Sequence, residues 1–507
     1  MPPDESSEVI RILMELRPAL GGHAGIPQAT RLLFRNLAGS AQFALTGLIQ
    51  SHNKVLARGV GKRLPNSASG LSRDKEIDRY GRVVISIEQG VTDWYIRAVI
   101  LTVLSVIKHA AGGAHRLRVF DAEAFHDFVW RRFFENTLPP EDFEQVVQAA
   151  YRVVRLPWTA MHLLGLFAGN LGINLYPRLD TRDFDIMIAE TPYPGRVSRN
   201  TSFVIRYHDA IPLLMPHTIS DRRWHQAFHY RALRQNANDG AWFVCVSEAT
   251  RTSLLSVFPQ IEDRSLTIHN SVSHHYFDEE AQPGQIGRII KARLNKNIPR
   301  VDFGAINRSL ANQDRSGRPF EFLLVVSTIE PRKNHLNLLN AWERLRASKY
   351  EDLFLIVVGA LGWHHRLIVQ RFRPWMEQAR LFLLTSVLSS ELRMLYKMAR
   401  ATICPSFGEG FDFSGVEAMR SGGVVVASDL PVHREIYAEG AEYFNPYSVD
   451  SMAEAIDMAI RSENSLLRHE LIEKGRRVGA KYGNESILPK WTSFLDSLYQ
   501  KRRSNLL

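Results

Sequence analysis

Short apolar runs alternate with segments of helical periodicity along the first half of the chain. The apolar run Val9–Leu16 is followed by a glycine-rich break, by apolar positions at helical spacing from Ile26 to Leu37, and by a second run, Phe43–Ile49. Strand, loop, helix and strand in this order are typical of the start of a parallel α/β domain. Four further strands are expected at 186–189, 203–207, 242–246 and 266–269. The first half is therefore predicted to form one doubly wound sheet.

A similar alternation restarts after Asn307–Pro319, a polar, glycine-bearing segment that is predicted to be an interdomain linker. Strands are expected at 320–327, 353–358, 381–384, 401–404 and 424–427. With the helical patterns between them, they predict a second Rossmann-like domain. A final helical stretch, Ile487–Tyr499, follows that sheet. The predicted units are an N-terminal domain of residues 1–310, a second domain of residues 318–482 and a terminal helix within 483–507.

The N-terminal domain is expected to carry a large insertion at about residues 51–183. Two stretches of this insertion, Ala98–Ile107 and Leu156–Pro177, are unusually apolar. The first is shorter than the ~18 apolar residues that cross a membrane, and the second includes Pro157, His162 and two asparagines, whose polar groups are unfavourable in hydrocarbon. Buried core helices are therefore favoured over an interfacial contact with a membrane.

Composition narrows the class of protein. The 507 residues are 45% apolar and 23% charged, which is typical of globular domains and excludes a disordered chain. The two cysteines, Cys245 and Cys404, lie in apolar runs without metal-ligand spacing, and the acidic N-terminus lacks a secretory signal, so a cytoplasmic protein is expected. The formal charge of +10 suits an anionic partner, which nucleic acid, acidic lipid or a phosphorylated small molecule would each provide.

Candidate chemistry lies in the loops after the strands of the second domain, since ligands of open α/β sheets bind at the carboxyl ends of the strands. Arg332 and Lys333 follow the first strand of this domain, directly before a helix. A forked donor and a point charge beside the positive end of a helix dipole suit a diphosphate. A solvated turn is the alternative interpretation of this pair.

The loop and helix over 405–419 contain two glutamates, Glu409 and Glu417. In a continuous helix this spacing would turn them away from each other, so Glu409 is placed on the loop and Glu417 in the helix that follows. The glycines beside Glu409 allow a close approach to a ligand, and its carboxylate can then reach sugar hydroxyls. Ser414 and Glu417 also have the spacing of a capping box, so Glu417 either caps its helix, binds a ligand or does both.

Four segments follow one another in the second domain: STIEPRKNHLNLLNAWERL, VVGALGW, LSSELRMLYKMARATICPSFGEGFDFSGVEAM and ASDLPVHREIYAEGAEYFNPYSVDSMAEAI. Over about Phe322 to Ile460 they resemble the donor-binding domain of glycosyltransferase family 4. Weaker similarity extends to AGIPQATRLLFRNLA, RYHDAIPLLMP, FVCVSEATR and IHNSVS in the first domain. Family 4 enzymes are retaining and have the GT-B fold. The resemblance therefore implies two Rossmann-like domains that face each other across a cleft, with the C-terminal helix returning to the N-terminal domain.

By position, the resemblance implies that Arg332 and Lys333 hold the donor diphosphate and stabilise the charge of the leaving group, in place of a metal ion. It assigns Glu409 to the hydroxyls of the donor sugar and Glu417 to the nucleotide ribose. The other assigned contacts are the backbone of Gly410 and Phe411 against sugar or phosphate, Gly25 facing the diphosphate across the cleft, His208 near the donor sugar, and the backbone at Val387 near the nucleobase.

The chain departs from the family pattern at several positions. Asp412-Phe413-Ser414 replaces the usual Gly-Leu-Pro, so the wall beside the donor sugar differs and the identity of the sugar does not transfer. The other departures are Ala360 for a common lysine, Ser271 for a glycine, and Pro27 for a glycine of the N-terminal loop. The changes at Ala360 and Ser271 are compatible with activity.

The resemblance predicts a metal-independent, retaining glycosyltransferase with no cofactor besides its donor substrate. It would move a hexose from a nucleoside-diphosphate sugar, with GDP-mannose favoured over UDP-sugars, to a saccharide or lipid-linked saccharide acceptor in surface polysaccharide synthesis. The leaving phosphate would itself help to take the acceptor proton, so the side chains position the substrates and stabilise charge. The alternative is a catalytically silent nucleotide-sugar-binding or scaffold protein of the same fold.

Three other motifs have structural interpretations. Asp183-Phe184-Asp185 has the form of a metal-binding DxD motif, but it precedes an apolar run, so its carboxylates are interpreted as turn and cap residues. The histidine pairs at 274–275 and 364–365 lack a third ligand at recognisable spacing. No nucleic-acid-binding motif is present. The resemblance implies a nucleotide sugar and its acceptor as partners, and the remaining positive charge favours a peripheral contact with an anionic membrane on the inner face of the plasma membrane.

Overall fold

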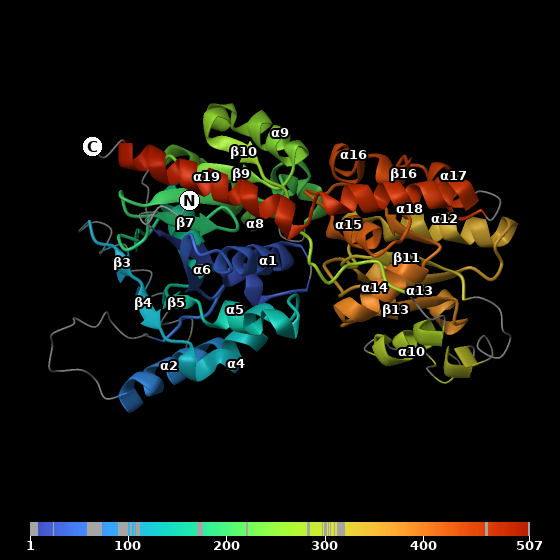
Figure 1. The fold of residues 1–507 in the computed structure, drawn as a ribbon, viewed down its shortest axis with the longest axis horizontal. Coiled ribbons are helices and arrows are strands. Elements are labelled where there is room, and N and C mark those ends of the chain that lie inside the picture. The colour runs from blue at the N-terminus through green and yellow to red at the C-terminus, as the bar shows by residue number, and fades with distance from the viewer. Residues whose placement is uncertain are drawn as a thin grey trace, which may run out of the picture.

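The computed structural model describes residues 9–504, apart from 24, 58–72, 90–99, 170–175, 220–221, 281–283, 312–319, 462–464 and scattered positions within 102–111 and 297–309. Two predominantly parallel sheets lie in two domains, which stand side by side in Figure 1. The two α/β domains expected from the alternating pattern are therefore confirmed.

The N-terminal sheet has eight strands in the order β10-β9-β8-β7-β1-β2-β5-β4, and each neighbouring pair is parallel except β4 with β5. The strands are β1 (Ile10–Glu15), β2 (Phe43–Ile49), β4 (Arg118–Phe120), β5 (Ala150–Val153), β7 (Ile186–Ala189), β8 (Ser202–Tyr207), β9 (Trp242–Cys245) and β10 (Ser265–Thr267). The central strand β7 is buried at every position. A parallel strand with both faces covered reads as a continuous apolar run, which is why this one was recognisable in the sequence.

Helices and a small second sheet complete this domain. The helices are α1 (Ile26–Ala38), α2 (Arg73–Glu88), α4 (His126–Val129), α5 (Phe143–Val147), α6 (Trp158–Gly169), α7 (Ile211–Leu214), α8 (Arg222–Asn238) and α9 (Glu248–Val257). The small sheet pairs β3 (His115–Arg116) with β6 (Leu179–Asp180). Helix α1 follows β1 and begins at Ile26 with Gly25 as its N-cap, as the helical periodicity from Ile26 predicted.

The segment 51–183 is partly built into the main sheet. Its strand β5 pairs in parallel with β2, and β4 pairs with β5 at the sheet edge. The sequence analysis missed β5, which is short and interrupted by Arg152. Within this segment, helix α6 buries Met161 and Leu164, as expected of a core helix.

The other apolar stretch of this segment was expected to be buried, and its described residues contradict that expectation. The described positions within 100–107 are helical, but Ile100, Leu104 and Ile107 are each at least half exposed, at 52%, 52% and 60%. Spaced four and then three residues apart, they lie on one helical face, which the packing of the domain leaves uncovered. None of the helices in the described part of the chain is long and apolar enough to cross a membrane.

The second domain has a six-stranded parallel sheet in the order β13-β12-β11-β14-β15-β16. The strands are β11 (Phe322–Val326), β12 (Phe354–Val358), β13 (Leu381–Leu384), β14 (Ala401–Cys404), β15 (Val425–Ser428) and β16 (Ala441–Phe444). The helices are α12 (His335–Ser348), α13 (Arg366–Glu377), α14 (Ser389–Met398), α15 (Phe413–Arg420), α16 (Pro431–Tyr437), α17 (Val449–Ile460) and α18 (Ser465–Ala480). Only β16 was not anticipated, because half of AEYF is polar or exposed.

Helix α10 (Gly284–Arg293) belongs spatially to the second domain, although the predicted N-terminal domain extended to residue 310. It contacts α14 and β13, and Leu294 forms a bridge with Leu384 at the edge of the sheet. The described residues within 304–311 are helical, and Leu310 is buried. The part of the predicted linker that is described is therefore packed helix, and the connection between the domains lies before α10.

Helix α19 (Asn484–Ser504) returns to the first domain, as the resemblance implied. It follows α18 of the second domain and then contacts α1 and β8, with Trp491 and Leu495 buried in the interface (Figure 1). Burying large apolar side chains is the main driving force for such docking. The chain therefore crosses between the domains twice, once before α10 and once in α19.

Candidate active site

Arg332 and Lys333 lie in a short turn at the carboxyl end of β11, as predicted. The turn, Pro331–Lys333, is followed by Asn334, whose backbone has a left-handed conformation with φ 57°. The Asn334 side chain donates hydrogen bonds to the backbone oxygens of Pro405, at 3.0 Å, and Pro446, at 2.9 Å. The first bond ties the turn to the loop after β14 and the second ties it to the loop after β16, so three loops far apart in sequence are held together at one edge of the sheet.

Glu409 forms ion pairs with both of these cations. Its Oε1 accepts from Lys333 Nζ at 2.5 Å, and its Oε2 lies 3.0 Å from Arg332 Nη1. Burial favours the neutral acid, but Arg332 and Lys333 outweigh it and hold the pKa of Glu409 below its usual range. Arg332 is also paired with Glu330 at 2.9 Å. The structure therefore brings together three residues that the sequence analysis singled out, and their charges fix one another in place.

The loop of Glu409 touches the first domain at Gly410. The Gly410 oxygen accepts a hydrogen bond from Ser247 Oγ at 2.7 Å, and Ser247 is the N-cap of α9. A Cβ at position 410 would lie 1.8 Å from the backbone oxygen of His208. Only glycine permits this approach, so Gly410 forms a close contact between the domains, and the contact of its backbone with sugar or phosphate stays a prediction.

His208 follows β8, and its ring is buried and turned toward the first domain. Its Nε2 lies 3.2 Å from Glu190 Oε2, and the same carboxylate is 3.2 Å from Arg206. Burial lowers the pKa of His208 even though Glu190 opposes the effect. No sequence signal linked His208 with Glu190, since Glu190 follows a different strand. The backbone of His208, rather than its ring, contacts the Glu409 loop.

Glu417 is 4% exposed and faces the first domain from α15. Its two oxygens accept hydrogen bonds from Gln28 Nε2 of α1, at 2.6 Å, and from the Tyr396 hydroxyl, at 2.9 Å. Burial raises the pKa of Glu417 to about 7 against the opposing effect of these hydrogen bonds. The capping-box interpretation is wrong, because the side chain of Asp412 caps α15 by accepting from the Ser414 amide at 3.2 Å.

Asp412 explains the first departure from the family pattern. It has a left-handed backbone with φ 63°, a conformation that glycine adopts without strain and that aspartate tolerates better than most residues. Its carboxylate caps α15 and lies 3.4 Å from His433 Nε2. Burial opposes ionisation, but the nearby His433, the charge of Lys333 and the hydrogen bonds from Ser414 keep the pKa of Asp412 low. The chain thus places a charge where the family usually has none.

The remaining predicted residues lie at the edges of the site. Gly25 is exposed at the start of α1 with φ 72°, and a Cβ there would meet nothing within 4 Å. Val387 is half-buried directly before α14, whose N-terminus is closed by Glu391 accepting from the Leu388 amide. Phe411 is buried, and its ring packs edge-on against Phe413 and Tyr482. Gly25 is therefore open to solvent and Val387 is partly exposed, whereas the buried side chain of Phe411 stabilises the loop.

A second group of polar and aromatic side chains lies where β1 and β2 end, and the sequence analysis missed it. Arg17 stacks over the ring of Trp158 at 4.2 Å and is paired with the buried Glu15 at 2.7 Å. His52 stacks on Trp158 at 5.0 Å, and Trp158 contacts His162 at 3.9 Å between ring centroids. The members come from three separate segments. Only the position of Arg17 just after a strand could have drawn attention to this aromatic cluster.

Asp185 of the DxD motif is held by Arg11 at the amino end of β7. It accepts hydrogen bonds from the Arg11 amide at 2.9 Å and from Nη2 at 2.8 Å. This agrees with the interpretation of the motif as structural. In the described part of the chain, no group of three or more histidine, cysteine, aspartate or glutamate side chains is arranged to hold a metal ion.

Comparison with known proteins identifies the family. Residues 310–478 match the family described as "Glycosyl transferases group 1". Over 286 residues the chain is 35% identical to the O-antigen chain mannosyltransferase RfbU of Salmonella typhimurium, which covers 50% of this chain and 78% of that protein. The chain belongs to the glycosyl transferases group 1 family. The family match includes the loops that carry Arg332, Lys333 and Glu409.

A mannosyltransferase and a solved structure are also similar to this group 1 chain. The serotype-specific mannosyltransferase WbdA of Escherichia coli is 35% identical over 154 residues, which is 29% of this chain and only 18% of WbdA. Sucrose-phosphate synthase from Thermosynechococcus elongatus superposes with a TM-score of 0.57 at 13% identity, over 97% of this chain and 100% of that chain. This structural likeness shows the fold alone, and it confirms the expected GT-B architecture.

Proposed function

We propose that the chain is a retaining, metal-independent family 4 glycosyltransferase that moves a hexose from a nucleoside-diphosphate sugar, with GDP-mannose favoured. The acceptor is a saccharide or lipid-linked saccharide in surface polysaccharide synthesis. The observation that carries the proposal is the cluster of Arg332, Lys333 and Glu409, buried at the carboxyl edge of the second sheet and in contact with the first domain through Gly410. The names of the relatives RfbU and WbdA support a mannosyl donor.

In the proposed reaction, Arg332 and Lys333 bind the donor diphosphate and stabilise the negative charge that grows on it as the sugar leaves. Glu409 is freed from part of its ion pairs and accepts hydrogen bonds from hydroxyls of the donor sugar. The anomeric C–O bond to phosphate breaks, the acceptor oxygen bonds to the same face of the sugar, and the acceptor proton passes to the leaving phosphate. No metal ion enters these steps.

The other predicted residues complete the proposed donor site. Glu417 binds the ribose hydroxyls, and Val387 contributes its backbone beside the base. Gly25 at the start of α1 faces the diphosphate, where the helix dipole adds favourable charge. His208 lines the donor sugar side through its backbone contact with the Glu409 loop.

We assign the acceptor to the aromatic cluster of the first domain. Trp158 is half-buried and His52 is exposed, so both present ring surface at the edge where β1 and β2 end. Flat rings with polar tips suit a saccharide, which has apolar faces and hydroxyl edges. Arg17, fixed over Trp158, adds a donor group to this surface.

We further propose that the enzyme works at the inner face of the plasma membrane. The exposed apolar face of Ile100, Leu104 and Ile107 is suited to an interfacial contact, and the net charge of +10 favours an anionic surface. The buried free thiols of Cys245 and Cys404 fit a reducing compartment.

The test is a transfer assay with a panel of GDP-, UDP- and dTDP-sugars, with and without EDTA. Lys333→Ala and Glu409→Ala are each expected to lower transfer by about 100-fold or more, since each removes a charge from the site. Lys349→Ala, which removes a half-exposed lysine paired with Asp457 on the same domain, is the matched control and should retain activity. Binding of a nucleotide sugar without turnover would favour the silent alternative. Near-normal transfer by a folded Lys333→Ala variant would refute the site assignment.

A further inference from the structure

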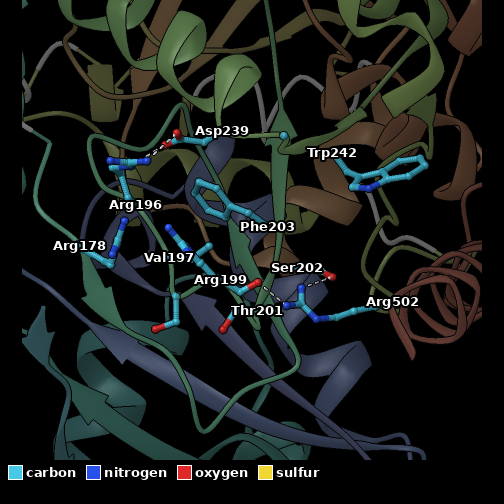
Figure 2. Close-up of a pocket in the computed structure, with 12 residues that line it drawn as sticks. Arg178, Arg196, Val197, Arg199, Thr201, Ser202, Phe203, Asp239, Trp242 and Arg502 are labelled. Atoms are coloured by element: carbon cyan, nitrogen blue, oxygen red, sulfur yellow. Dashed lines mark hydrogen bonds and ion pairs between the residues drawn. The ribbon is translucent and has the colours of Figure 1, made fainter. Parts of the chain in front are cut away.

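A cavity of about 310 Å³ opens at the edge of the N-terminal sheet opposite to the proposed active site. Ser202 and Trp242, the first residues of β8 and β9, line it, so it lies at the amino ends of these parallel strands (Figure 2). Substrates of open α/β sheets bind at the carboxyl ends. The cavity is therefore separate from the donor and acceptor sites proposed above.

Four arginines line this cavity: Arg178, Arg196, Arg199 and Arg502. We call it the arginine pocket. Asp239 is the single carboxylate in its lining, and it is committed to Arg196 through two hydrogen bonds of 3.1 and 3.2 Å. In the part of the chain that the structure describes, the other three guanidinium groups make no ion pair. The pocket therefore holds about three uncompensated positive charges.

Arg196 and Arg502 are held in place by hydrogen bonds and Arg178 is half-buried, whereas Arg199 is exposed. Arg502 Nη1 donates to Ser202 Oγ at 3.2 Å, and Arg502 Nη2 donates to the backbone oxygen of Arg199 at 2.5 Å. The Nε of Arg178 is buried without a hydrogen-bond partner. Figure 2 shows Arg178 and Arg196 on one side of the pocket and Arg502 on the other. A buried donor without an acceptor is unfavourable, and an anion between these side chains would satisfy it.

We propose that the arginine pocket binds a phosphate-bearing anion, either a free phosphate compound or the headgroup of an anionic lipid. Guanidinium groups bind phosphate oxygens through paired, charge-assisted hydrogen bonds, and the cavity is large enough for a small ligand. Arg502 belongs to α19, which arrives from the second domain, whereas Arg178 belongs to the first. An anion that binds both arginines therefore fastens the end of α19 to the first domain.

The test is calorimetric titration of the full chain with inorganic pyrophosphate. Because the proposed donor site also binds this probe, two classes of site are expected, of which Lys333→Ala removes only one. Arg178→Gln and Arg502→Gln are each expected to weaken binding to the other class by about tenfold and to leave the class that depends on Lys333 unchanged. Arg131→Gln, which removes an exposed arginine of the same domain with the same charge change, is the control and leaves both classes intact.

Two further measurements assign the source of the anion. Hydrogen exchange is measured on the Lys333→Ala variant, in which the proposed donor site no longer binds pyrophosphate. Slower exchange of the amides in segments 196–203 and 499–504 on addition of pyrophosphate places the ligand in the arginine pocket. Sedimentation with vesicles of phosphatidylcholine, with and without phosphatidylglycerol, tests the lipid. If pyrophosphate binds and this binding depends on Arg178, the ligand is a free phosphate compound. If only the vesicles bind and their binding depends on Arg178, the ligand is a lipid headgroup. The proposal is overturned if neither probe distinguishes Arg178→Gln and Arg502→Gln from Arg131→Gln.

Discussion

Replacing Glu417 by glutamine should remove a pH dependence of stability that the wild-type chain carries. Glu417 is 4% exposed, and its carboxylate accepts hydrogen bonds from Gln28 and Tyr396. Burial raises its pKa from 4.5 to about 7. The folded chain therefore holds a proton at Glu417 over a pH range in which the unfolded chain has lost it. Glutamine keeps the volume of the side chain and removes the ionisation.

The sign and size of the effect follow from proton linkage. The contribution of Glu417 to stability is fully present below about pH 4.5 and is lost as the pH rises through about 7. At about 1.4 kcal/mol for each pH unit, the interval between the two pKa values corresponds to about 3 kcal/mol. Between pH 5 and pH 8 the wild type should lose about 2 to 3 kcal/mol relative to Glu417→Gln.

Urea unfolding followed by tryptophan fluorescence at several pH values between 5 and 8 measures this difference. The quantity to compare is the wild-type free energy of unfolding minus that of the variant, because groups common to both proteins cancel. Glu351→Gln, which changes an exposed glutamate of the same domain, is the control and should give a difference that does not vary with pH. If the curves of wild type and Glu417→Gln remain parallel from pH 5 to pH 8, the explanation of Glu417 by burial is incorrect.

Three other substitutions test the contacts around the site. Gly410→Ala should lower the activity, and it should lower the free energy of unfolding by about 1 to 3 kcal/mol, because the new Cβ would lie 1.8 Å from the His208 oxygen. An unchanged melting temperature would contradict this close approach. Asp412→Ala should lower the free energy of unfolding by about 1 to 3 kcal/mol, because the variant loses the cap of α15. Asp412→Gly should lower it less, because glycine adopts the φ of 63° without strain. Equal losses of stability in calorimetry would contradict this role of φ. Gln28→Ala should raise the pKa of Glu417 further and shift the pH profile of GDP binding upward, and an unmoved profile would exclude that link.

The strand order along the chain and the chemistry of two loops could be predicted because both are local properties. A buried parallel strand such as β7 is apolar at each position, and a helix such as α1 repeats every 3.6 residues, so the pattern of a few neighbouring residues is sufficient. The loops with Arg332 and Glu409 were found because each directly follows a strand. The family resemblance assigned both loops to one donor site, but neither it nor the spacing predicted that Arg332 and Glu409 form an ion pair.

Predictions were wrong or incomplete where a residue's surroundings come from distant parts of the chain. Spacing suggested that Glu417 caps its helix, but Asp412 takes that position and Glu417 is held by Gln28, 389 residues away in the sequence. Helix α10 was assigned to the first domain by its place in the sequence, although its apolar side packs on β13 and α14. The apolar run at 100–107 resembled a core helix, yet nothing in the described structure covers its outer face.

The sequence by itself determined the two α/β domains and the identity of the charged residues that follow their strands, because short-range periodicity fixes where the backbone is buried and where it emerges. Only the tertiary structure decided which charges meet and which remain uncompensated. Glu409 pairs with both Arg332 and Lys333, whereas Arg178 and Arg502 lie in one pocket although they are far apart in the sequence. Such long-range pairings depend on how the domains pack, and packing is set by burial over the whole molecule rather than by neighbouring residues.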